Sequence, residues 1–244
     1  MHRFFTDASC IDNGIVNITG DDVGHITKVL RLREGDEISV CNKAGMDYTC
    51  AIESISKETV TAKILCQSPS KTESNINITL YQGIAKGDKM DYIIQKGVEL
   101  GVNKFVPVVT KRTVVKISDG AKKTSRWQKI ATEASKQSVR GIIPVVSEPM
   151  DFNDIVKTIS QAGNALNIMA YENESNIKLK NIIKNSKCTN VNIIIGPEGG
   201  FDEAEAELAR ANGINTVTLG PRILRTETAP VAVCSAIMYE LGDW

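Results

Sequence analysis

The chain has 244 residues, enough for one large domain or two of ordinary size, and its hydrophobic fraction of 42% is enough for a packed core. No stretch is apolar over the length of a membrane span, and the opening residues lack the apolar region of a signal peptide, so we expect a cytoplasmic protein with no membrane partner. The 29 basic and 29 acidic residues balance, so net charge alone does not point to a polyanion as partner.

Residues 1–70 are predicted to form a small β domain. Apolar and polar residues alternate in several short runs separated by turn-forming residues, which is the pattern of a barrel. These runs are 37–41, 48–52 and 59–64, and a helix is expected over 21–30. The polar, turn-rich segment 67–76 is typical of a linker and indicates the domain boundary.

Residues 74–244 are predicted to form an α/β domain in which apolar strands alternate with helices. The expected strands are 76–82, 104–109, 165–171, 191–195 and 214–219, and the expected helices include 88–101, 126–139 and 229–241. The last helix carries more apolar surface than one face needs, which suggests burial against both the sheet and a partner subunit.

Two of these strands, 191–195 and 214–219, each run into a loop that begins Gly-Pro. The first loop is 196–200 and the second loop is 220–230. The helix between them has a capping-box pattern at Asp202 and Glu205 and a terminating Gly213. Parallel strands are expected here, and ligands bind beyond the carboxyl ends of such strands. Two stiff loops at adjacent strand ends therefore predict one ligand cleft, although simple connecting turns are the alternative.

Charge is distributed unevenly along the chain. Residues 83–140 hold 13 basic and 5 acidic residues, a net charge of +8, whereas residues 198–244 hold 3 and 8, a net charge of −5. A local positive field attracts polyanions whatever the total charge. The basic span 83–140 therefore predicts a nucleic-acid surface, with a solvated helical face as the alternative.

The six cysteines are scattered without a CxxC pair, and the chain has only two histidines. Zinc-site spacing is therefore absent, and we expect reduced cysteines and no metal. His25 lies outside the domain of the Gly-Pro loops, and no catalytic role is assigned to it.

The motifs GPEGGF and LGPRILRTETAP, taken together, are similar to the signature of the RsmE family. These SPOUT-class methyltransferases use S-adenosylmethionine to methylate N3 of a uridine in 16S ribosomal RNA of the small subunit. The opening HRFF and the run HITKVLRLREGD also resemble the family, so the resemblance runs nearly end to end and is strongest after residue 190.

The resemblance implies a SPOUT-type α/β domain over 74–244, with a mostly parallel sheet and a trefoil knot, and a PUA-like β-barrel over 1–70. It also implies a homodimer formed through the knotted domain. S-adenosylmethionine is expected to lie against backbone groups from three strand ends. Its predicted contacts are Ala170, Tyr171, Gly196, Pro197, Glu198, Gly199, Leu219, Gly220, Ile223, Leu224, Arg225, Thr228 and Ala229. A side chain at Gly199 is expected to block this approach.

Methylation at uracil N3 requires a proton acceptor and positive charge facing the oxygens of the developing anion. Arg225 is favoured over Arg222 for the charge because it lies deeper in the second loop. Glu227 or Glu198 is predicted to accept the proton, and a carboxylate that binds amides of its own loop is the alternative.

A phosphate-binding surface is expected from basic residues of both domains, each of which is alternatively a solvated side chain. The predicted residues are Arg3, Lys28, Arg31, Lys86, Lys111, Arg112, Arg126 and Arg140. A non-catalytic RNA-binding module and a methyltransferase for a different RNA are the other interpretations. An ordinary nucleotide-binding enzyme is disfavoured because neither G-x-G-x-x-G nor a P-loop lysine follows a strand.

Overall fold

The computed structural model describes residues 1–115, 120–161, 163–184 and 186–244. The chain forms two compact units: Met1–Glu73 with Ser135–Ile143, and Ser74–Ala134 with Pro144–Trp244. Nothing in the sequence pattern indicated that 135–143 belongs with the first unit. Among the described helices, none combines the length and the apolar character that crossing a membrane requires.

The first unit contains a six-stranded sheet in the order β1-β4-β5-β6-β3-β2, antiparallel except where β1 pairs with β4. Its strands are β1 Arg3–Phe5, β2 Ile11–Asp12, β3 Ile15–Thr19, β4 Glu37–Cys41, β5 Met46–Ile55 and β6 Thr59–Pro69. The last three were predicted, and β6 extends into the polar segment that was taken as linker. The expected helix is α1, Asp21–Gly24, followed by a π-helical turn over His25–Val29.

The segment 135–143 is built into this first unit by partly buried polar contacts. The guanidinium of Arg140 donates to both carboxylate oxygens of Glu73 at 2.8 Å, and the Gly141 N–H donates to the same carboxylate at 2.6 Å. Arg3 donates to the carbonyl oxygen of Arg140 at 3.0 Å and to Asp47 at 2.7 Å. Pairing satisfies the charges that burial would otherwise penalise, so these arginines are part of the unit's interior.

The second unit is organised around a seven-stranded sheet in which every strand pair is parallel. The order is β10-β8-β7-β12-β11-β13, with β9 beside β8. The strands are β7 Asn77–Gly83, β8 Val102–Val109, β9 Val145–Val146, β10 Met150–Asp151, β11 Leu166–Ala170, β12 Asn190–Ile195 and β13 Asn215–Val217. The two Gly-Pro loops follow β12 and β13, so the expectation of adjacent strand ends was wrong: β11 lies between them.

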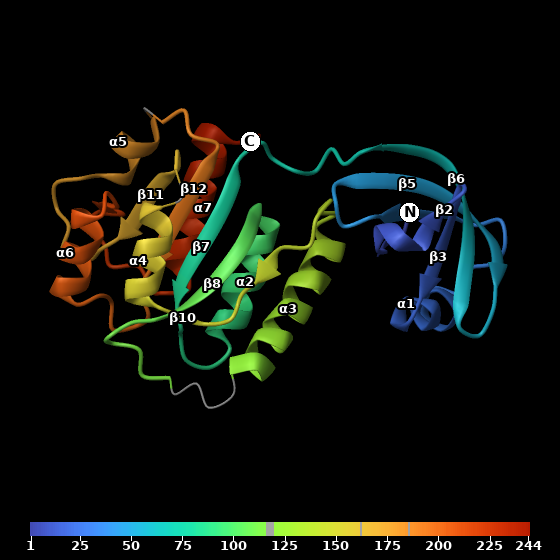
Figure 1. The fold of residues 1–244 in the computed structure, drawn as a ribbon, viewed down its shortest axis with the longest axis horizontal. Coiled ribbons are helices and arrows are strands. Elements are labelled where there is room, and N and C mark those ends of the chain that lie inside the picture. Colours follow the sequence, from blue (N-terminus) through green and yellow to red (C-terminus); the bar gives the residue numbers. More distant parts are fainter. Residues whose placement is uncertain (116–119, 162, 185) are drawn as a thin grey trace. The chain divides into compact units, whose positions relative to one another are not determined.

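Helices cover both faces of this sheet (Figure 1). Among the described residues, one face is covered by helices α2 Lys89–Glu99, α3 Gly120–Gln137, α5 Leu179–Lys184 and α7 Thr228–Leu241. The other face is covered by α4 Phe152–Ser160 and α6 Glu203–Ala211. With both faces buried, the carboxyl edge of the parallel strands is the part of the sheet left for a ligand.

The helix that follows the first loop begins and ends as its sequence predicted. The Asp202 side chain accepts from the Ala204 N–H at 3.2 Å, and Glu205 accepts from the Asp202 N–H at 2.9 Å, so the capping box of α6 is complete. Gly213 follows the helix with φ of +77°, a left-handed conformation that favours glycine. The cap therefore fixes the point at which the first loop turns into α6.

Candidate active site

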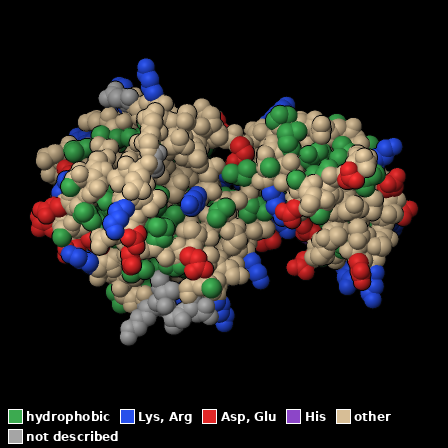
Figure 2. Space-filling model, in the orientation of Figure 1, with side chains coloured by type: hydrophobic (Ala, Val, Ile, Leu, Met, Phe, Trp, Pro, Cys, Tyr) green, Lys and Arg blue, Asp and Glu red, His purple; other side chains and the backbone are tan. Residues whose placement is uncertain are grey.

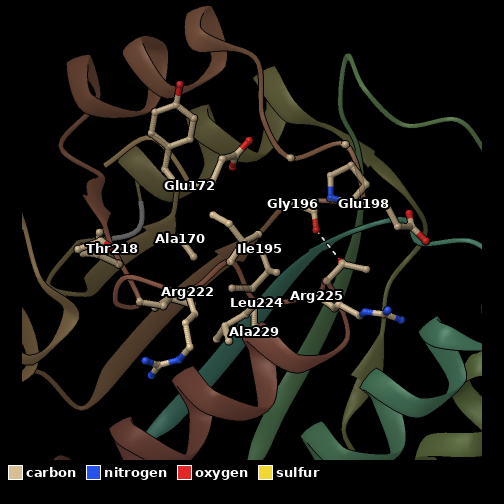
Figure 3. A pocket seen from close by; sticks show the side chains of 18 of the residues that line it. Ala170, Glu172, Ile195, Gly196, Glu198, Thr218, Arg222, Leu224, Arg225 and Ala229 are labelled. Atoms are coloured by element: carbon tan, nitrogen blue, oxygen red, sulfur yellow. Dashed lines mark hydrogen bonds between the residues drawn. The ribbon is translucent and has the colours of Figure 1, made fainter. Parts of the chain in front are cut away.

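The carboxyl ends of β12, β11 and β13 open onto one cavity of about 440 Å³ (Figure 3). Every residue predicted to contact the cofactor lines it except Thr228. The remaining lining residues are Lys89, Glu172, Ile195, Gly200, Val217, Thr218, Arg222 and Thr226. The position of β11 between the other two strands gives the cavity a third loop, residues 171–178, beside the two Gly-Pro loops.

At two positions of the cavity the backbone conformation favours glycine over any other residue. Gly200 has φ of +65°, and a Cβ built there would lie 2.0 Å from a carboxylate oxygen of Glu172; Gly220 has φ of +114°. Both values lie in the region that side chains rarely adopt. Gly199 differs, since a Cβ built on it would lie 3.1 Å from Cβ of Arg112. A side chain at Gly199 would therefore press on Arg112, and the expectation that it would block the approach of the cofactor stays a prediction.

Arg222 and Arg225 both line the cavity and are exposed. Figure 3 shows their guanidinium groups pointing away from each other, with that of Arg225 on the side of Glu198. The carbonyl oxygen of Arg225 accepts the N–H groups of Thr228 and Ala229, both at 2.9 Å. The start of α7 thus holds the Arg225 backbone while its side chain stays available to a substrate.

An ammonium group that the sequence reasoning missed links the two Gly-Pro loops. Lys89 Nζ lies 3.0 Å from Glu198 of the first loop and 3.5 Å from Glu227 of the second. The hydrogen bond to Glu198 is the main reason why the pKa of Lys89 is raised. The only sequence signal for Lys89 was its place directly after Asp88 at the start of a helix, off the apolar face.

The same contacts distinguish the two carboxylates proposed as proton acceptors. Burial raises the pKa of Glu198, but the N–H of Lys86 at 3.0 Å and the Lys89 ammonium outweigh it, and the net shift is downward. A carboxylate with a lowered pKa is a weaker base, so Glu198 is the less suitable acceptor. Glu227 does not line the cavity. Its Oε2 is buried and lies 3.5 Å from the Lys89 ammonium, without a hydrogen bond among the described residues.

The third loop is held by a buried carboxylate. Glu174 accepts the N–H groups of Asn176 at 2.9 Å and Ile177 at 3.2 Å, and the hydroxyl of Thr216 at 2.9 Å. The Asn176 bond is the largest cause of the lowered pKa of Glu174. Arg210, 3.5 Å from Glu174, also lies over the ring of Tyr171. These contacts fix the loop that carries Tyr171 and Glu172 to the cavity.

The predicted phosphate contacts fall into two groups. Arg3 and Arg140 are corrected: the Arg3 side chain is 8% exposed, Arg140 is 4% exposed, and both are paired inside the first unit. The others are exposed, namely Lys28 and Arg31 in the first unit and Lys86, Lys111, Arg112 and Arg126 in the second.

Several of the exposed cations have acidic or carbonyl partners. Lys111 lies 3.0 Å from Asp202, Arg126 pairs with Asp91, and Arg112 donates to the carbonyl oxygen of Gly199 at 3.0 Å. On the face shown in Figure 2, basic and acidic side chains are interspersed. Asp202, Glu198 and Glu227 lie outside residues 83–140, so their pairing with Lys111 and Lys89 makes the positive field weaker than the net charge of +8 implies.

Comparison with known proteins assigns both units. Residues 72–238 match the family of the RNA methyltransferase domain, and residues 18–65 match the RNA methyltransferase PUA domain. The chain is 40% identical to ribosomal RNA small subunit methyltransferase E of Bacillus subtilis, over 98% of this chain and 97% of that protein. It is 31% identical to the Aquifex aeolicus protein of the same name, over 98% and 99%.

Solved structures agree with this assignment. Ribosomal RNA small subunit methyltransferase E from Neisseria gonorrhoeae, bound to S-adenosylmethionine, has a TM-score of 0.90 and 34% identity, and the match covers 100% of this chain and 99% of that one. A putative methyltransferase from Legionella pneumophila with the same cofactor has a TM-score of 0.86 and 30% identity, over 99% and 98%. The expected α/β domain and PUA-like domain are thus confirmed, and the chain belongs to the ribosomal RNA small subunit methyltransferase E family.

Proposed function

We propose that this protein transfers a methyl group from S-adenosylmethionine to N3 of a uridine in 16S ribosomal RNA. The observation that carries the proposal is the convergence of three strand-end loops on one cavity, in a chain whose relatives of the same fold bind that cofactor. A non-catalytic RNA-binding module would need no such cavity.

The cavity fits the cofactor in size and in chemistry. Its volume of about 440 Å³ is within the range of small-molecule sites. Apolar side chains, including Ile195, Leu219 and Leu224, suit an adenine ring, and the glycines of the first loop let backbone N–H and C=O groups approach polar atoms. When bound, S-adenosylmethionine supplies an electrophilic methyl group.

The residues of this chain then have to remove the N3 proton of the uracil and stabilise the resulting anion. N3 carries a proton, so the reactive base is an anion whose charge spreads to O2 and O4. Arg225 offers paired donors to such a planar anion, and Arg222 is the second candidate. Glu227 accepts the N3 proton in this proposal, because Glu198 already accepts hydrogen bonds from the Lys86 N–H and the Lys89 ammonium, whereas Lys89 lies farther from Glu227, at 3.5 Å.

RNA is held by the exposed basic residues of each unit in this proposal. They are Lys28 and Arg31 in the first unit and Lys86, Lys111, Arg112 and Arg126 in the second. The outer face of α7, which includes Ala232 and the 74% exposed Tyr239, forms a homodimer contact. A ribosomal RNA substrate in turn places the protein in the cytoplasm.

Mass spectrometry of 16S ribosomal RNA nucleosides from cells with and without this protein tests the proposal. We expect 3-methyluridine to disappear without the protein and to return when the gene is restored. If 3-methyluridine stays and a different methylated nucleoside disappears, the substrate is another base or another RNA. If no nucleoside changes, the proposed activity is wrong.

A further inference from the structure

A buried side chain at the end of β7 reaches both Gly-Pro loops. Gln82 is 1% exposed, and its amide nitrogen donates to the Gly83 carbonyl at 3.0 Å, to the Thr226 hydroxyl at 3.0 Å and, more weakly, to the Gly196 carbonyl at 3.4 Å. Gly196 begins the first loop and Thr226 lies in the second. Gln82 itself does not line the cavity, whereas both of these partners do.

Thr226 completes the connection between the loops. Its hydroxyl donates to the Gly196 carbonyl at 2.7 Å, the hydrogen bond drawn in Figure 3. A hydroxyl has one proton, so the bond from Gln82 must reach a lone pair of the Thr226 oxygen, which the geometry allows. The contacts among Gln82, Thr226 and Gly196 form a buried three-residue clasp.

The orientation of the Gln82 amide follows from its surroundings. The nitrogen faces two carbonyl oxygens and a hydroxyl whose proton is already used. Turning the amide over would place its oxygen against those acceptors. The Gln82 oxygen in turn has no hydrogen-bond partner among the described residues, so the clasp depends on the donor end of the side chain.

The backbone beside the clasp packs closely against the first loop. A Cβ built on Gly83 would lie 2.4 Å from the nitrogen of Pro197 and 2.8 Å from the carbonyl carbon of Gly196. The first loop therefore rests directly on the end of β7, and the clasp ties the second loop to it at the same place.

We propose that Gln82 is a positioning residue for methyl transfer, which sets the separation of the two loops through Thr226 and Gly196 before the cofactor binds. The proposal rests on the proposed function, since it concerns the geometry of the same cavity. A preformed site binds more tightly because less order must be imposed on binding, and small misplacements of reacting groups slow a reaction strongly.

Paired substitutions separate this role from simple packing. Thr226→Val keeps the shape but removes the hydroxyl, Thr226→Ser keeps the hydroxyl, and Gln82→Leu removes the donor without touching the cavity. We expect Gln82→Leu and Thr226→Val each to lower kcat/KM by about a hundredfold. Thr226→Ser should recover most of this loss, and the double variant should be little worse than either single variant because both break one clasp.

Gln128→Leu is the matched control. Gln128 on α3 also makes two side-chain bonds to backbone, donating to Pro144 at 3.0 Å and accepting from Val146 at 2.9 Å, but it lies outside the cavity lining. We expect Gln128→Leu to lower the melting temperature without changing cofactor affinity.

Two readouts keep the test independent of methylation. Calorimetry with S-adenosylmethionine measures affinity, and hydrogen exchange measures the order of the loops through hydrogen-bonded amides such as Gly200 and Thr228. In the absence of cofactor, exchange at these amides should speed up in Gln82→Leu and Thr226→Val, return in Thr226→Ser and stay unchanged in Gln128→Leu. If Gln82→Leu does not fold, the Thr226 pair decides by the same criteria.

Unchanged cofactor affinity and unchanged loop exchange in Gln82→Leu and Thr226→Val would overturn the proposal. A wild-type protein that binds the cofactor but methylates no RNA would contradict the proposed function instead, and the exchange data would still decide the role of the clasp.

Discussion

The loops at the cavity and the basic span 83–140 are the two most conspicuous features of the sequence, and the fold uses them differently. The glycines and prolines of the loops determine the backbone conformation at their own positions, and the predicted residues lie around one cavity. The cations of the basic span act at a distance, and part of their charge is taken up by acidic residues from 198–244.

These ion pairs explain why the loop motifs predict a site better than the basic span does. Lys89 meets Glu198 and Glu227, and Lys111 meets Asp202, each across about 90 residues or more of sequence. The net charge of a sequence segment omits acidic residues that lie far away in the sequence but pair with its cations in the folded protein. A loop motif at a strand end therefore predicts a site more directly than a run of like charge does.

The largest effect is expected where the first loop packs against the end of β7. Gly83→Ala places a methyl group against the backbone of Gly196 and Pro197, which must then move. We expect cofactor affinity, measured by calorimetry, to fall by more than about a hundredfold. Gly24→Ala is the control, because a Cβ there meets nothing within 4 Å. Equal affinity in the two variants would show that the first loop does not need its present position.

The next effect concerns the charge beside the cavity. Arg225→Ala should lower the single-turnover methylation rate by a factor of about a hundred, or on the order of 3 kcal/mol, with cofactor affinity nearly unchanged. Arg225→Lys should be almost as slow, because an ammonium does not offer paired donors. Arg222→Ala should slow the reaction less, since the Arg222 guanidinium points away from the Arg225 guanidinium and from Glu198. The roles would be exchanged if Arg222→Ala proved the slower variant.

A smaller effect tests the third loop through its pH dependence. The pKa of Glu174 is lowered from 4.5 in the folded protein, first by the Asn176 N–H. The stabilisation is therefore complete above pH 4.5 and is lost as the pH falls through the lower folded value. Glu174→Gln should lower the free energy of unfolding at pH 7 by about 1–2 kcal/mol and flatten its decline in acid.

Urea unfolding between pH 7 and pH 3 measures both changes. The exposed Glu53→Gln makes the same change of charge and serves as the control. An acid decline as steep in Glu174→Gln as in the parent would mean that Glu174 does not anchor the loop.

The smallest effect tests the basic span. Lys86→Ala should weaken RNA binding and lower the slope of log affinity against log salt by about one unit, if Lys86 meets one phosphate. Lys63→Ala, an equal loss of charge on an exposed strand residue, should leave the slope unchanged. Equal slopes for parent, Lys86→Ala and Lys63→Ala would remove Lys86 from the RNA surface.

Features that depend on neighbouring residues could be predicted from the sequence, whereas features that depend on distant residues could not. The capping box of α6 and the two Gly-Pro loops each depend on residues that are close together in the sequence, so short motifs were sufficient to predict them. Arg140 was misassigned because its partner Glu73 lies 67 residues away. Gln82 left no pattern, since its contact with Thr226 spans 144 residues. The trefoil knot stays a prediction from the family resemblance.

The central claim is that the three strand-end loops form the cofactor site, and hydrogen exchange with and without S-adenosylmethionine tests it most directly. We predict slower exchange in 170–172, 196–200 and 219–229 when the cofactor is added, with no change in β5 and β6 of the first unit. Protection confined to other segments, or no protection in these three loops at saturating cofactor, would contradict the account.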